Sequence, residues 1–293
     1  MKLFKKDSNA KVLLFISAIV FTVMMLDVNP VNLSYKPIKD ATSAYHRNVA
    51  YRNWESTEGE FVELRYKQVD RKHSDFMQSL GDKMYLHLQD KYNFKPKTTP
   101  LIVIYPTQQK MLQSLGWDSD KSVSGVYQSG TIRLLSPTQW YRNEVDLETT
   151  QQFYKKNGPL LHEMTHYFVD EMTFGNYPTW YTEAVAQLEE YKKFNIQWLD
   201  DQNTDPQELY PLEKLVDNFY AVENQSLAYR QALVIAIFME DKFGHNIHKE
   251  LLDKMDVRIS FEQALKITTG TTQEELKYKW QSWILQNRNK YFG

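Results

Sequence analysis

The sequence predicts an α+β protein, in which a small N-terminal mixed sheet with helices is followed by a mainly helical half. Short apolar or alternating segments typical of strands lie before residue 136, and helical spacing dominates from residue 145 onward. The composition is that of a globular protein, with 42% hydrophobic and 25% charged residues. One membrane-anchor helix is expected to precede this domain.

The N-terminus joins a basic segment, residues 1–11, to an apolar run, residues 12–26. This run is short for a membrane-spanning helix but long enough for the apolar region of a signal sequence. Because no small-x-small cleavage site follows, we expect an uncleaved signal-anchor whose amino end faces the cytoplasm by the positive-inside rule. The rest of the chain would then lie outside the cytoplasm of a bacterial cell, tethered by a single pass through the cell membrane. Cleavage with secretion and a buried soluble helix are the alternatives.

A stalk is expected between the anchor and the folded domain. Residues 27–54 are polar, contain Pro30 and Pro37, and lack strong hydrophobic periodicity. The folded domain is therefore expected to cover residues 55–293.

The elements of the sheet half follow in order. Residues 60–66 alternate between polar and apolar side chains, which predicts a strand, and residues 69–92 have apolar side chains at helical spacing. Residues 101–105 form a continuous apolar run that is typical of a buried strand. Residues 123–127 and 131–135 flank a glycine-containing turn and predict a hairpin.

The helical half is expected to consist of helices separated by glycine and proline. These breaks fall at Gly158, Gly175, Pro206, Gly244 and Gly270. The helix expected after Gly158 lies at the junction between the sheet and the helical half, and it contains the most informative motif of the chain.

That motif is H-E-x-x-H, in which His162 and His166 lie four residues apart and Glu163 follows the first histidine. On a helix the two imidazoles share one face and can bind one metal ion, and the glutamate can act on a metal-bound water. The flanking residues are apolar, so the motif would bury three polar groups. Their burial would cost several kcal/mol without a metal or other partners. The motif therefore predicts a metal site.

A third ligand is needed, and Glu183 is the best candidate. A continuation with histidine at position 172 is excluded because that residue is Met172. Glu183 opens a second helix after a short turn, and two helices joined in this way pack antiparallel, which can bring Glu183 opposite the histidines. The alternative is that Glu183 is only a favourable charge in the first turn of a helix. Its apolar neighbours favour an inward position, whereas Glu189 and Glu190 are expected to be solvated.

The pattern L-x-H-E-x-x-H, followed by W-x-x-E-x-x-A, resembles the gluzincin metallopeptidases, which include thermolysin, and within them the peptidase MA-like family. The resemblance covers roughly residues 55–288. Its weaker C-terminal motifs are Tyr229-Arg230-Gln231-Ala232, Ser260-Phe261-Glu262-Gln263-Ala264-Leu265, Thr269-Gly270-Thr271-Thr272 and a helix with Trp280. One departure is Ala184, where the family usually has glycine after the ligand glutamate.

The resemblance implies a zincin core in which His162, His166 and Glu183 bind Zn²⁺ and Glu163 is the general base. It also makes Tyr229 the candidate donor of a hydrogen bond to the oxyanion, with Tyr177 and Tyr181 as weaker candidates; the alternative is that Tyr229 is a buried structural tyrosine. Two further expectations complete the site. Residues 131–135 are the edge strand that pairs with an extended peptide, unless they form only a structural hairpin. Asp170 and Gln187, each one helical turn from a ligand, are candidate partners of the ligands.

The expected function is hydrolysis of peptide or protein substrates, with endopeptidase action favoured because no motif for binding a free amino terminus is visible. A non-hydrolytic, metal-stabilised binding or regulatory ectodomain is the alternative. An intramembrane protease is disfavoured because charged residues flank the motif. The net charge of −2 gives no electrostatic reason to expect nucleic acid, and the absence of cysteine excludes thiolate ligands. The substrate and the oligomeric state stay open.

Overall fold

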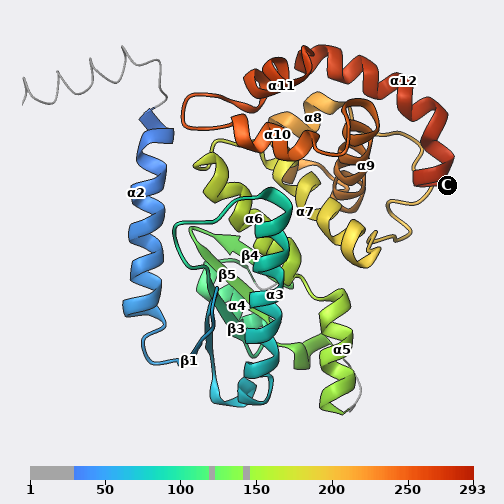
Figure 1. The fold of residues 1–293 in the computed structure, drawn as a ribbon. Helices are drawn as coiled ribbons and strands as arrows, with labels where there is room; N and C mark the ends of the chain where they lie inside the picture. Colours follow the sequence, from blue (N-terminus) through green and yellow to red (C-terminus); the bar gives the residue numbers. More distant parts are fainter. Residues whose placement is uncertain (1–29, 119–122, 141–145) are drawn as a thin grey trace, which may run out of the picture.

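The computed structural model describes residues 30–118, 123–140 and 146–293 (Figure 1). The strands in these residues are β1 (Glu55–Glu58), β2 (Glu63–Tyr66), β3 (Leu101–Tyr105), β4 (Gly125–Gln128) and β5 (Thr131–Leu135). The α-helices are α2 (Pro30–Tyr45), α3 (Ser74–Tyr92), α4 (Gln108–Leu115), α5 (Leu147–Asn157), α6 (Leu160–Thr173), α7 (Thr179–Phe194), α8 (Leu212–Asn218), α9 (Gln225–Phe243), α10 (Ile247–Lys254), α11 (Phe261–Thr269) and α12 (Gln273–Phe292). Short turns of π- or 3₁₀-helix are η1 (His46–Ala50), η2 (Gln68–His73), η3 (Pro137–Trp140) and η4 (Phe219–Ala221).

The strands form one mixed sheet in the order β1-β2-β3-β5-β4. Strands β2, β3 and β5 are parallel, whereas β1 and β4 are antiparallel to their neighbours and form the two edges. Helix α3 connects β2 to β3, because parallel neighbours need a crossover connection. The structure thus confirms the predicted small mixed sheet followed by helices.

The hairpin of β4 and β5 is also confirmed. Ser129 and Gly130 connect the strands with φ angles of 48° and 77°, and two consecutive residues with positive φ are typical of tight hairpins. Ser124 accepts a hydrogen bond of 2.9 Å from the backbone of Leu135. Since hydrogen-bonded pairs alternate along an antiparallel ladder, the backbone groups of Gly125 and Tyr127 point to the open edge.

The main core joins one face of the sheet to the helices. Ile102 of β3 and Ile132 of β5 pack with the buried face of α3, whose Leu80 and Leu88 have the helical spacing predicted from the sequence. The same core continues through α6, α7 and α9, while α10, α11 and α12 gather at the far side of these helices (Figure 1). Helix α6 therefore lies between the sheet and the helical half, as predicted.

Helix α2 corrects the prediction of a stalk at residues 27–54. In the structure this segment is helical from Pro30 to Tyr45 and runs along the flank of the domain (Figure 1). Its inward side chains include Lys39 and Ser43, which are 4% and 8% exposed. These contacts are polar, and Pro30 and Pro37 are typical of a non-helical segment, so the sequence does not predict a helix that packs against the domain.

No helix in the described part of the chain is long and apolar enough to span a bilayer. The predicted anchor at residues 12–26 lies outside the described residues, so it stays a prediction.

Candidate metal centre

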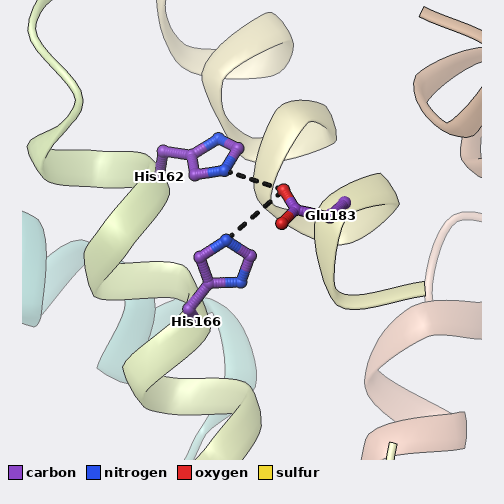
Figure 2. Close-up of side chains that lie close together, drawn as sticks. All are labelled: His162, His166 and Glu183. Atoms are coloured by element: carbon purple, nitrogen blue, oxygen red, sulfur yellow. Dashed lines mark hydrogen bonds and ion pairs between the residues drawn. The ribbon is translucent and has the colours of Figure 1, made fainter. Parts of the chain in front are cut away.

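The candidate ligands come from two consecutive helices joined by a tight turn. His162 and His166 lie one turn apart on α6. The helix ends at Thr173, and the positive φ angles of the next two residues, 58° at Phe174 and 76° at Gly175, reverse the chain. Helix α7 then packs against α6 and places Glu183, in its second turn, opposite the two histidines (Figure 2).

The three side chains meet at one point. Glu183 Oε2 lies 3.1 Å from His162 Nε2 and 3.5 Å from His166 Nε2, and ligand atoms of the three residues all lie within 4.8 Å of one another (Figure 2). Ligand atoms bound tetrahedrally at about 2.0–2.2 Å from one ion are about 3.3–3.6 Å apart. The arrangement therefore fits a single metal ion.

The electrostatics of the cluster favour a cation. Burial opposes a positive charge on His162, but Glu190 and Glu183 hold its pKa well above the usual value. Burial also opposes charge on Glu183, yet His166 and His162 hold its pKa well below its usual range. The cluster thus carries buried negative charge that a proton or a metal ion must balance, and metal binding displaces such protons.

Each histidine is held by a second partner on its other ring nitrogen. His162 Nδ1 lies 3.1 Å from Glu190 Oε2, and the Trp198 indole N–H donates to the same oxygen at 3.0 Å. His166 Nδ1 lies 2.7 Å from Thr182 Oγ1. Partners of this kind fix the ring orientation and tautomer of a metal-binding histidine, so both Nε2 atoms stay directed at Glu183.

The prediction that Glu189 and Glu190 are solvated is wrong, because both are 1% exposed. Glu189 accepts a hydrogen bond of 2.8 Å from Tyr92 and pairs with Lys91. A signal for Glu190 was available in the sequence. It lies seven residues after Glu183, which is two helical turns, and therefore on the same helix face.

The two residues predicted to support the ligands have other partners. Asp170 lies 3.1 Å from the Lys39 ammonium and accepts a hydrogen bond from the Tyr127 hydroxyl. Gln187 donates to the backbone carbonyl of Tyr229 at 2.7 Å. Both predictions are wrong because one helical turn carries each side chain past the cluster to a neighbouring element.

Glu163 is buried against the edge of the sheet. Burial raises its pKa, whereas His162 and His166 lower it, as does the backbone N–H of Tyr127 that faces its carboxylate. A Cβ atom at Gly125 would lie 2.7 Å from Glu163 Oε1, so glycine leaves the space that the carboxylate occupies. The edge strand at the site is therefore β4. The prediction of residues 131–135 is wrong, because β5 is paired on both sides.

Two tyrosines, Tyr220 and Tyr229, lie near Glu183. Tyr220 donates to Glu183 Oε1 at 2.6 Å, and its hydroxyl is hydrogen-bonded to Tyr229. Burial, reinforced by Glu183, raises the pKa of both phenols, so both remain protonated donors. Tyr181 contacts a buried histidine of α10 and Tyr177 a tyrosine of α2. Tyr220 was not predicted, since η4 matches no motif that was singled out.

Replacing Glu190 with glutamine is expected to weaken metal binding by about 10- to 100-fold, as is typical when an outer partner of a ligand histidine is lost. The amide keeps the size of the side chain but removes the charge that faces His162 Nδ1. Metal affinity measured by competition with a chelator tests this. The matched control is Glu189→Gln, which is equally buried but bonded to Tyr92. Equal affinities of the two variants would show that Glu190 does not support the ligand.

The fold and the histidine–glutamate cluster define a metallopeptidase-like protein. The chain belongs to the peptidase MA superfamily, whose family model matches residues 86–286 and thus includes the whole cluster. No curated protein matches the sequence significantly. The family predicted from the sequence is therefore confirmed. Ala184, where the family usually has glycine, is fully buried within α7.

Proposed function

We propose that this chain is a membrane-tethered zinc metallopeptidase that hydrolyses peptide bonds outside the cytoplasm. The observation that carries the proposal is the cluster of half-buried His162 with buried His166 and Glu183, beside the buried carboxylate of Glu163. Two imidazoles and one carboxylate are a donor set of catalytic zinc sites, which keep one position for water or substrate. The membrane tether and the location rest on the basic and apolar sequence of residues 1–26.

Each residue around the cluster then has a role. Bound zinc would supply a water of lowered pKa and a Lewis acid for the peptide carbonyl. Glu163 would accept the proton of the attacking water and pass it to the leaving amine. Tyr229 would turn its single O–H from Tyr220 to the carbonyl oxygen of the substrate as negative charge develops there.

The open edge of β4 supports a peptide substrate. The backbone groups of Gly125 and the carbonyl of Tyr127 point away from β5, whereas the N–H of Tyr127 faces Glu163. An extended peptide can pair with such an edge with little dependence on its sequence. Because Tyr127 also contacts Glu163, a peptide bound along β4 would lie next to the candidate base. Pairing with an internal segment of a chain favours endopeptidase action.

Removal of the metal tests this function. The full-length protein in detergent is expected to release bound zinc to a chelator, to lose hydrolysis of an unstructured protein substrate, and to regain it with one equivalent of zinc. Metal content and product formation are measured on the same samples. Hydrolysis that survives complete removal of the metal contradicts the proposal. Zinc binding without hydrolysis would instead support the alternative of a non-hydrolytic binding or regulatory ectodomain.

A further inference from the structure

A buried lysine of α2 reaches the helix that carries the histidines. The Lys39 ammonium lies 3.1 Å from Asp170 Oδ2 and also pairs with Glu171. Asp170 is fully buried, and its Oδ1 atom has no hydrogen-bond partner. Two adjacent buried carboxylates are strongly destabilising without a cation. The C-terminal half of α6 therefore depends on a charge that α2 supplies.

Asp170 also connects this ion cluster to the edge strand. The Tyr127 hydroxyl donates to Asp170, while the backbone N–H of the same residue faces Glu163, and Gly125 of the same strand lies against the Glu163 side chain. Strand β4 is thus bonded through the Tyr127 side chain to the partner of Lys39, and its backbone lies against the candidate base. If Asp170 moves, Tyr127 loses one of the contacts that hold β4 against α6.

Further contacts fix α2 along the domain. Tyr35 packs on the turn between α6 and α7, where a Cβ atom at Gly175 would lie 2.4 Å from its ring. Beyond the end of α2, His46 Nδ1 lies 2.8 Å from Thr131 Oγ1 of β5. Lys39 lies between these two contacts, and the helix therefore spans from the turn to the sheet (Figure 1).

We propose that Lys39 is a positioning residue, which keeps β4 in place beside Glu163 through Asp170 and Tyr127. This inference rests on the proposed peptidase function, since β4 is where we place the substrate. Lys39 touches neither a candidate ligand nor the general base. Its loss should therefore weaken substrate binding and turnover while the metal stays bound. The segment that follows the predicted anchor then belongs to the catalytic apparatus.

The test compares full-length variants in detergent. Lys39→Met removes the charge and keeps most of the side-chain length, Lys39→Arg keeps the charge, and Lys36→Met is the matched control. Lys36 lies on the same helix and pairs at 3.2 Å with Asp40 of that helix, at the surface. Three quantities are measured: kcat and KM for a peptide that the wild type cleaves, zinc content, and hydrogen exchange of residues 124–128.

Lys39→Met is expected to lower kcat/KM by about 10- to 100-fold, the scale of a small misplacement of substrate. It should also speed hydrogen exchange in β4, with zinc content unchanged. Lys39→Arg should retain most of the activity and Lys36→Met all of it. Lys39→Met/Asp170→Asn should recover part of the loss, because the asparagine is neutral and its oxygen still accepts from Tyr127.

Two results would overturn the inference. One is a folded Lys39→Met variant with unchanged kcat/KM and unchanged exchange in β4, even if its thermal stability falls, since the cluster would then serve only the fold. If Lys39→Met does not fold, Tyr127→Phe replaces it in the test. The second overturning result is then unchanged hydrogen exchange in β4 of Tyr127→Phe, because the Tyr127 hydroxyl would not help to hold β4 in place. A wild type that cleaves no peptide contradicts the proposed function, while the exchange measurement still decides the role of Lys39.

Discussion

Glu163→Gln is expected to lower kcat by about 100- to 10,000-fold, the usual contribution of a general base, while the metal remains bound. The amide keeps the size of the side chain but cannot take up a proton from water. Glu163 is not one of the three residues whose ligand atoms converge, so the affinity for the metal should stay close to that of the wild type. The measurements are single-substrate kinetics and metal content of the purified variant.

A matched control separates this effect from a general loss of structure. Glu262 is an exposed glutamate in the first turn of α11, and Glu262→Gln should leave both kcat and the melting temperature unchanged. The mechanism is contradicted if Glu163→Gln hydrolyses peptide at the wild-type rate with zinc bound. Loss of zinc in Glu163→Gln would mean that this carboxylate is itself a ligand.

Glu183→Gln should release the metal. Glu183 Oε2 lies within 3.5 Å of both His162 Nε2 and His166 Nε2, so the substitution removes the charge at the centre of the cluster. Metal affinity should fall by more than the roughly 10- to 100-fold expected for an outer partner such as Glu190. His162→Ala should have a similar effect because it removes one of three ligands.

Competition with a chelator, followed by a count of bound metal, measures these affinities. The order of the variants is as informative as the size of the effects. Glu183→Gln and His162→Ala should bind metal more weakly than Glu190→Gln, and Glu190→Gln more weakly than Glu163→Gln. If Glu183→Gln binds as tightly as Glu163→Gln, the third ligand is another residue and the cluster has a structural role.

The parts of the site that the sequence predicted depend on local geometry. Helical periodicity alone puts His162 and His166 on one face, and the short turn after α6 brings Glu183 opposite them. Strand β3 follows in the same way from its apolar run, and the hairpin of β4 and β5 follows from two short apolar segments around turn residues. These features need no knowledge of contacts between distant segments.

The features that were missed depend on contacts between distant segments. The sequence of a hairpin does not say which of its strands is paired on both sides, and the predicted edge, β5, is an inner strand while β4 is the edge. The packing of α2 on the domain is not predictable from the sequence, because Lys39 binds acidic groups more than a hundred residues away. A helix face that makes polar contacts also lacks the regular spacing of apolar residues that marks a packed helix. Tyr220 approaches Glu183 only through tertiary packing.

The open edge of β4 has a consequence for which proteins would be cut. The strand is four residues long, and an extended chain advances about 3.3 Å per residue, so its edge accepts a short stretch with free backbone groups. Native helices and paired strands already use those groups. Under the proposed function, chain flexibility would therefore select the targets: unstructured tails and misfolded proteins would be degraded, and compact proteins would be spared.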